Sequence, residues 1–151
     1  MAVSGSGLFC ATILDVFDAT GTVINLITPS TAHKWAMFTN TITPNFTTDT
    51  AYAVAPYNAN EVSGAGYTAG GTVVASPTFT ASAGIVTYDQ ADTSWAASTI
   101  TNARAGLLYA DALAGNFAIC LVDFAADYST VNGTFLITWN ALGVFTIDLV
   151  P

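Results

Sequence analysis

The sequence predicts a mainly β protein: a single-domain antiparallel β-sandwich or flattened barrel with one short N-terminal helix and a long glycine-rich loop. The chain has 151 residues, of which 52% are hydrophobic, enough to build one buried core. From residue 72 onward, short runs rich in β-branched and aromatic residues alternate with turn residues at the spacing of an all-β domain. No internal repeat or linker is visible, so residues 1–151 are expected to form one domain.

The N-terminal region predicts the helix. Residues 1–7, MAVSGSG, are expected to form a flexible arm without a positively charged targeting region. The run LFCATILDVF at 8–17 spaces its apolar residues as a short amphipathic helix does, and the following DATG ends it. Because the run is short, a buried strand is the competing interpretation.

Two strands and a loop region are expected next. Residues 22–28 and 34–42 have strand composition, separated by PSTAH. The second strand presents two apolar faces, formed by Trp35 with Met37 and by Phe38 with Ile42. Residues 43–71 contain two prolines and then the glycine-rich stretch NEVSGAGYTAGG, which predicts a long loop region with a helical turn near TDTAYAV.

The remaining half reads as strand. Strands are expected in GTVVASPTFTAS, GIVTYD, STITNARAGLLYA and NFAICLVDF, and the last is apolar on both faces, as in a central, doubly covered strand. The alternating segments GTFLITW and GVFTIDL are joined by the four residues NALG, a common hairpin length. The chain is therefore expected to close with a hairpin.

Charge is the unusual feature of the composition. Only 8% of the residues are charged, and two cations, Lys34 and Arg104, face ten acids for a net charge of −8. An average soluble domain has about 25% charged residues. Nucleic acid and anionic membranes are excluded as partners, because both need clustered Lys and Arg. A surface with so few charges is poorly protected against self-association, which favours a subunit of an assembly.

The sequence contains no motif that predicts catalysis or a cofactor. GAGYTAGG lacks the GK[ST] ending of a phosphate loop and precedes a strand-like segment, so it is interpreted as a tight loop against a neighbouring backbone. His33 is the single histidine and is expected at the surface beside Lys34. Cys10 and Cys120 could form one disulfide, although free buried thiols are favoured.

The sequence contains two short acidic pairs. Asp89 with Asp92 and Asp123 with Asp127 could hold calcium, could act as the acid/base pair of a glycosidase, or could be turn residues at strand ends, which is the favoured interpretation.

Arg104 interrupts an apolar strand. Since an unpaired guanidinium would be costly there, it is expected to pair with an acid for a structural role. The candidate partners are Glu61, Asp92 and Asp123.

Four blocks of the sequence occur in an order that resembles a family of tailed-bacteriophage virion structural proteins: NEVSGAGYTAGG (60–71), DTSWAASTITNARAGLLY (92–109), CLVDF (120–124) and NGTFLITWNALGVFTIDL (132–149). The match covers about residues 58–149. The N-terminal part is similar more loosely, since the family usually begins with a short helix followed by a strand. One position departs: Ala125 follows Phe124 where the family tends to have glycine.

The resemblance implies a non-enzymatic virion component without cofactors. It favours a capsid decoration (cement) protein on the outside of the head shell, assembled in the host cytoplasm, with the major capsid protein and further copies of itself, as a homotrimer, for partners. A minor tail, baseplate or carbohydrate-binding adsorption protein is the alternative. That alternative expects an exposed aromatic platform at Trp35 or Trp95.

The glycine-rich segment is expected to lie flat on its own sheet or on an adjoining subunit, with Tyr67 as an apolar anchor carrying a polar tip. Arg104 and Trp139 are given structural roles. The interface candidates are Tyr52, Tyr57, Glu61, Gly64, Gly66, Tyr67, Gly70, Gly71 and Trp95.

Overall fold

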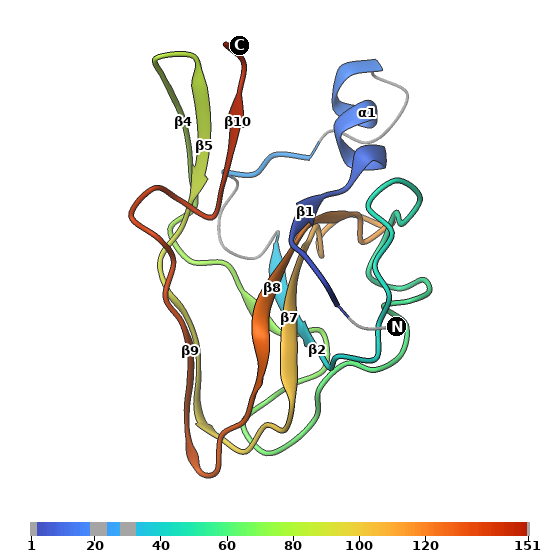
Figure 1. The fold of residues 1–151 in the computed structure, drawn as a ribbon, viewed down its shortest axis with the longest axis vertical. Coiled ribbons are helices and arrows are strands. Elements are labelled where there is room, and N and C mark those ends of the chain that lie inside the picture. Colours follow the sequence, from blue (N-terminus) through green and yellow to red (C-terminus); the bar gives the residue numbers. More distant parts are fainter. Residues whose placement is uncertain (1–2, 19–23, 28–32, 151) are drawn as a thin grey trace.

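The computed structural model describes residues 3–18, 24–27 and 33–150. One helix and ten strands follow each other along this part of the chain (Figure 1). Their bounds are β1 (Gly7–Leu8), α1 (Cys10–Asp18), β2 (Lys34–Phe38), β3 (Thr72–Val73), β4 (Thr78–Ser82), β5 (Ile85–Asp89), β6 (Thr93–Ser98), β7 (Ala103–Tyr109), β8 (Ala118–Tyr128), β9 (Gly133–Ile137) and β10 (Phe145–Asp148).

The strands form three antiparallel sheets. The largest has the order β1-β8-β7-β2-β3, the second β10-β5-β4, and the third pairs β6 with β9. In Figure 1 the second sheet projects as a wing at the upper left, at the opposite end of the molecule from the turn between β8 and β9. The expected mainly β, sandwich-like domain with one short N-terminal helix is confirmed.

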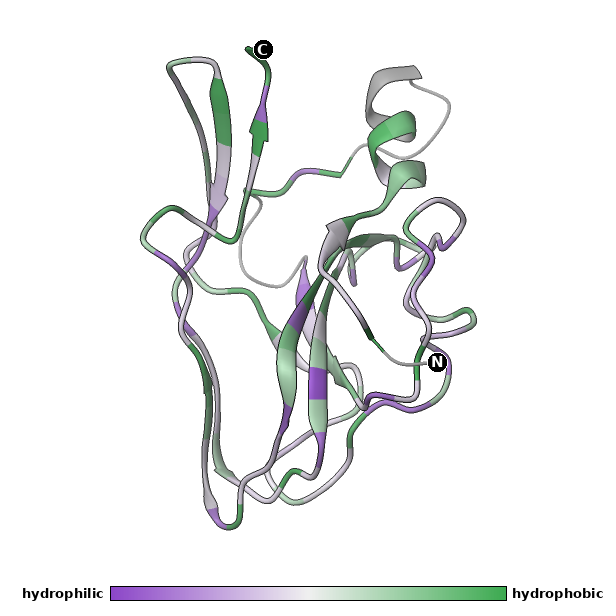
Figure 2. Cartoon of the chain, in the orientation of Figure 1, coloured by the Kyte–Doolittle hydropathy of each residue, from purple (hydrophilic) through white to green (hydrophobic). Residues whose placement is uncertain are grey.

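Two apolar clusters cover the two faces of the five-stranded sheet. Trp35 and Met37 belong to one cluster and Phe38 and Ile42 to the other, as the alternation predicts. The first cluster is completed by side chains of β5, β6 and β9, and the second by α1's neighbour Phe9 and by the 43–71 loop region. Figure 2 shows apolar residues along β7 and β8 of this sheet, and also on β5, β10 and α1.

The helix expected at 8–17 is confirmed as α1, preceded by the two-residue β1, and the competing strand interpretation is wrong for this segment. The described part of the strand expected at 22–28 is not a strand, and residues 26–27 form a turn. The Ile27 amide donates to the Asn25 side-chain oxygen at 3.1 Å, a local bond that competes with a strand ladder. The rest of that segment lies outside the described residues, as does most of DATG.

The prediction that GTFLITW and GVFTIDL pair as a closing hairpin is wrong. β9 pairs with β6, where Phe135 lies opposite Trp95, and β10 pairs with β5, where Phe145 lies opposite Tyr88. Gly143, at a φ of +95°, turns the chain out of the two-stranded sheet so that Val144 can donate to the Tyr88 carbonyl. Each strand pairs where its aromatic side chain meets another, and residues 138–144 connect the two sheets.

The N-terminal segment does not form a free arm. Val3 is 1% exposed, and its amide donates to the Asn40 side-chain oxygen at 3.0 Å. Gly7 and Leu8 then pair with β8 at Leu121 and Cys120. Residues 3–8 are therefore held at the edge of the central sheet, which gives the buried first half of β8 a neighbour on both sides.

Candidate functional site

The glycine-rich segment is fixed tightly on its own sheet, one of the two expected arrangements. A Cβ added at Gly71 would lie 1.7 Å from the Trp35 carbonyl oxygen, and one added at Gly64 would lie 1.8 Å from the Thr99 carbonyl oxygen. Both residues have positive φ, at +78° and +145°. Glycine is required at these positions by the close approach of two backbones.

Glu61 is the centre of this attachment. Its carboxylate accepts hydrogen bonds from the hydroxyl of Tyr52 at 2.6 Å, from the hydroxyl of Tyr67 at 2.6 Å and from the amide of Gly70 at 2.7 Å. The Tyr67 hydroxyl also accepts from the amide of Met37, which ties the loop to β2. We call Glu61, Tyr52, Tyr67 and Gly70 the Glu61 node.

The tyrosine hydroxyls of the Glu61 node act as hydrogen-bond donors to its carboxylate. Burial raises the pKa of Tyr52 and of Tyr67, and the hydrogen bonds to Glu61 add to the shift in both. Both hydroxyls stay protonated, as donors to a carboxylate must. Tyr109 extends the node by donating to the Gly70 carbonyl at 2.8 Å and stacking on the Tyr52 ring at 4.3 Å. Tyr67 is the apolar anchor with a polar tip that the sequence predicts.

Arg104 has an acidic partner, as predicted. Its Nε donates to Asp123 at 2.8 Å, its Nη2 donates to the Val3 carbonyl at 3.2 Å, and Asp127 lies 3.6 Å from Nη1. Glu61 and Asp92 are not its partners. The guanidinium thus joins β7, β8 and the N-terminal segment, which is a structural role.

The tryptophans are structural as well. Trp139 lies 4.7 Å from Trp35, centroid to centroid, and its Nε1 donates to Thr93 at 3.2 Å. Trp35 is fully buried and Trp95 is 5% exposed, so neither forms the aromatic platform that the adsorption alternative expects. Trp95 instead packs between Tyr67 and Phe135.

Not all interface candidates are accessible. Tyr57 is 1% exposed and donates to Asp49 at 3.1 Å, so it belongs to the core, as Trp95 and Gly70 do. A loop without an apolar period can still bury an aromatic residue, as Tyr57 shows, and Trp95 lies in the strand β6 and not in a loop as the sequence predicts. Gly64 and Gly66 are exposed, and the partly exposed candidates are Tyr52, Glu61, Tyr67 and Gly71.

His33 and one cysteine are also placed differently from expectation. His33 is buried, and burial lowers its pKa. Cys120 is a buried free thiol, but Cys10 is exposed, and the two form no disulfide.

The acidic pairs serve as turn and pairing residues. Asp89 accepts from the Gln90 amide and Asp92 from the Trp139 amide, while the other pair faces Arg104. Among the described residues, no group of three or more His, Cys, Asp or Glu side chains could hold a metal ion. The described residues also include no helix that is long and apolar enough to cross a membrane.

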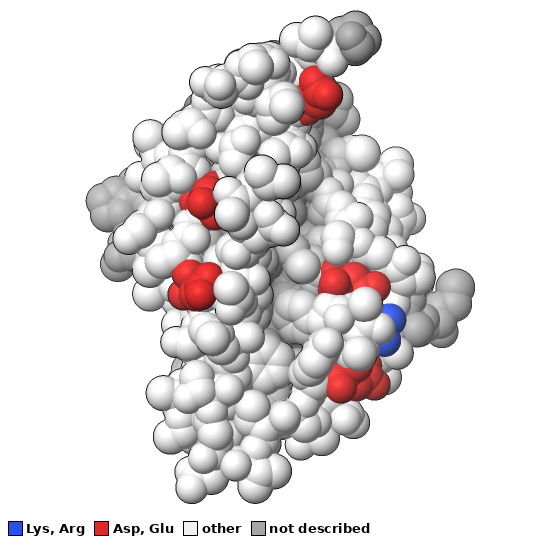
Figure 3. Space-filling view, turned by 60° about the vertical axis from the view of Figure 1, so that its left-hand side comes forward, with Lys and Arg blue, Asp and Glu red and all other residues white. Residues whose placement is uncertain are grey.

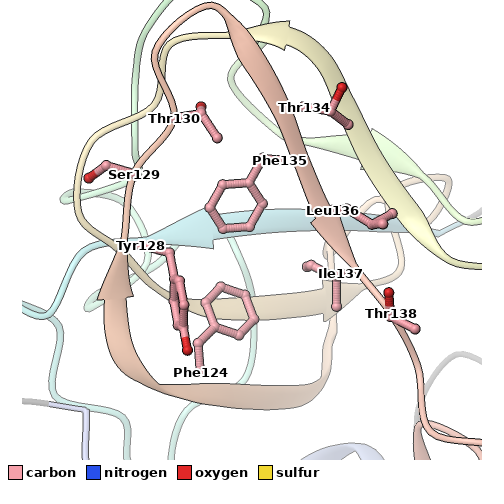
Figure 4. A pocket seen from close by; sticks show the side chains of 9 residues that line it. All are labelled: Phe124, Tyr128, Ser129, Thr130, Thr134, Phe135, Leu136, Ile137 and Thr138. Carbon is pink, nitrogen blue, oxygen red and sulfur yellow. The ribbon is translucent and has the colours of Figure 1, made fainter.

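One groove was not foreseen. It has a volume of about 440 Å³ and lies between the end of β8, the following turn and β9 (Figure 4). The rings of Phe124 and Tyr128 lie side by side at its edge below Phe135, and the other lining residues are Ser129, Thr130, Thr134, Leu136, Ile137 and Thr138. No Asp, Glu, Lys, Arg or His lines it, so the groove offers apolar surface and hydroxyls but no acid/base chemistry.

Comparisons with protein-family models, with curated proteins and with solved structures find no match to this chain.

Proposed function

We propose that the protein is a non-enzymatic structural component of a tailed-bacteriophage virion, most specifically a capsid decoration protein that binds the outside of the head shell. The observation that carries the proposal is that the four blocks of resemblance meet in space as one unit. The first block lies on the second where Gly64 approaches Thr99, and the Thr99 amide donates to the Ala65 carbonyl at 2.8 Å. The second contacts the third through Arg104 and Asp123.

The fourth block completes the unit. β9 pairs with β6 from Thr93 to Ser98, and the Ser98 hydroxyl donates to the Gly133 carbonyl at 3.3 Å. The residues that carry the resemblance are thus packed together, which is the arrangement that one shared structural unit requires.

The departure at Ala125 supports the resemblance too. Ala125 has a φ of +63°, a left-handed conformation that favours glycine. The family's glycine at this corner therefore corresponds to a conformation that this chain adopts, although it carries alanine there.

The surface is consistent with an assembly subunit. Within the described residues both cations form ion pairs with acids of the same chain: Lys34 with Asp111 at 2.8 Å and Arg104 with Asp123 at 2.8 Å. Figure 3 shows a face that is mostly uncharged, with scattered acidic side chains and one cationic group lying between two of them. Contacts to a shell would then be made by apolar side chains and backbone groups, and the acidic balance keeps the subunit away from packaged nucleic acid.

The proposal is tested by immunogold electron microscopy of virions that carry the gene, with antibodies raised against the purified chain. Label distributed over the head supports decoration, and label confined to the tail or baseplate supports the alternative. Virions without label would overturn both. Binding to expanded shells that lack the protein, measured by co-sedimentation, separates a head decoration protein from a minor head component.

The groove favours the adsorption alternative as a second candidate. Its exposed Tyr128 ring and its hydroxyl side chains are groups that pack on and bond to neutral sugars. If this candidate holds, Tyr128→Ala abolishes binding to host surface glycans, while the exposed Leu142→Ala, away from the groove, leaves it unchanged. Absence of glycan binding in the wild-type protein contradicts the candidate.

A further inference from the structure

The outer edge of β4 is an unguarded strand edge. β4 is the last strand of the β10-β5-β4 sheet, all five of its residues are exposed, and its register with β5 is regular from Thr78 to Ser82. In Figure 1 it forms the outer margin of the projecting wing, with no other element beside it. Natural edge strands are usually protected by charges, bulges, short length or a covering segment.

The other strand edges of the described residues carry such protection. β1 and β3 have two residues each, the β6–β9 pairing is irregular between Trp95 and Ser98, and β10 ends in Asp148. β4 has none of these, and residues 77–84, PTFTASAG, contain no charge. Pro77 precedes the strand and does not interrupt it.

The backbone groups that point outward can be assigned from the hairpin. Ala83 and Gly84, with φ of +50° and +81°, form a two-residue turn between Ser82 and Ile85. In such a hairpin the flanking pair exchanges both hydrogen bonds, so Ser82, Thr80 and Thr78 bond to β5. The amides and carbonyls of Phe79 and Ala81 therefore face away from the sheet.

This edge is complementary to itself. When two copies of TFTAS run antiparallel about a two-fold axis at Thr80, Phe79 faces Ala81 of the second copy, and the outward groups of these residues satisfy each other. The faces also match, because the hydroxyl side chains of residues 78, 80 and 82 lie on one face and Phe79 and Ala81 on the other. The large Phe79 ring, which is 43% exposed in the single chain, would lie against the small Ala81 side chain of the second copy.

The charge distribution permits association at this edge. Two copies with a net charge of −8 each repel one another, and within the described residues no cation lacks an acidic partner in its own chain. Two uncharged surfaces can approach each other without this repulsion between nearby charges, and the β4 edge is an uncharged strip.

We propose that β4 is a self-association edge, through which a second copy of this chain joins antiparallel to make one six-stranded sheet, β10-β5-β4 with its symmetry mate. The partner is the same chain, and the inference holds whether or not the proposed function is correct. It predicts a two-fold pair, in contrast to the homotrimer that the resemblance implies.

The test introduces a charged side chain at Thr80, the residue on the proposed two-fold axis. Thr80, Thr87 and Thr146 form a row across β4, β5 and β10, so Thr80→Lys and Thr146→Lys introduce the same charge on one face of the sheet, at opposite edges. Thr80→Lys brings two ammonium groups opposite each other in the pair, whereas Thr146→Lys does not. Each variant is compared with the wild-type protein by sedimentation equilibrium over a wide range of concentration.

We expect the wild-type chain to form a dimer of 15.6 kDa protomers. Thr80→Lys should raise the dimer dissociation constant by about tenfold or more, and so should Thr80→Glu. Mixing these two variants should restore the dimer, because opposite charges then meet, and Thr146→Lys should resemble the wild-type protein. A wild-type monomer, a trimer unaffected by Thr80→Lys, or equal weakening by Thr146→Lys would overturn the proposal.

A measurement on the wild-type protein keeps the test independent of how the variants fold. The outward amides of Phe79 and Ala81 should exchange with solvent more slowly as the protein concentration rises, since a second copy then covers them. Exchange of these two amides that does not change with concentration also overturns the proposal.

Discussion

Replacing Gly71 by alanine tests whether the glycine-rich segment is held by close backbone packing. The added Cβ would lie 1.7 Å from the Trp35 carbonyl oxygen and 2.8 Å from the Ala36 Cα, both backbone atoms of the buried strand β2. Neither can move without disturbing the ladder to β7. The φ of +78° adds strain of its own for any side chain.

The magnitude follows from these two terms. A residue with a Cβ in a left-handed conformation costs about 1–2 kcal/mol, and an extra methyl group forced into a packed site costs about 1–3 kcal/mol. Gly71→Ala is therefore expected to lower the free energy of unfolding by about 2–5 kcal/mol, a large part of the roughly 5–15 kcal/mol of a typical domain.

Urea denaturation followed by tryptophan fluorescence and circular dichroism measures this change. With a slope of about 2 kcal/mol per M, the unfolding midpoint should fall by about 1–2.5 M. Gly5→Ala is the matched control, because its added Cβ meets nothing within 4 Å, and it should stay within about 0.5 kcal/mol of the wild-type protein. A Gly71→Ala midpoint equal to that of the control would refute the packing argument.

Three further predictions concern stability. Arg104→Met should destabilise the protein by about 2–4 kcal/mol, because it leaves the largely buried Asp123 carboxylate without its cation. Asp127→Asn should cost under about 1 kcal/mol, because that carboxylate is more exposed and lies farther from the guanidinium. Equal losses of unfolding free energy in chemical denaturation would contradict this. Ala125→Gly should raise the melting temperature by up to about 3 °C, since relief of left-handed strain outweighs the entropy of glycine, and Ala126→Gly in the same strand, without positive φ, should lower it. Raising the pH above about 10 should unfold the chain cooperatively, because burial raises the pKa of Tyr57, Tyr88 and Tyr109 in the folded state. The stability that these protonated tyrosines contribute is complete below about pH 10, and it is lost at higher pH because only the unfolded state ionises there. Tyrosine absorbance and circular dichroism should then change together, and ionisation without loss of structure would contradict the assignment for Tyr57, Tyr88 and Tyr109.

Part of the candidate site could be predicted from the sequence. An arginine inside an apolar strand requires an acid, and Asp123 was among its expected partners because a charge cannot be buried unpaired. The role of Glu61 could not be predicted, because its three donors come from residues 52, 67 and 70, and only the folded loop brings them to one carboxylate. The groove beside Phe124 and Tyr128 was missed for the same reason, since its walls come from two strands that do not pair with each other.

The sequence by itself determined that the chain is built of strands, that a short helix stands near its N-terminus, and which residues of β2 face which side of the sheet. These properties are local, because the period of two fixes the face of each side chain. Only the tertiary structure decided which strands pair. A four-residue connection permits a hairpin but does not impose one, and the burial of Phe135 against Trp95 and of Phe145 against Tyr88 sends β9 and β10 to different sheets.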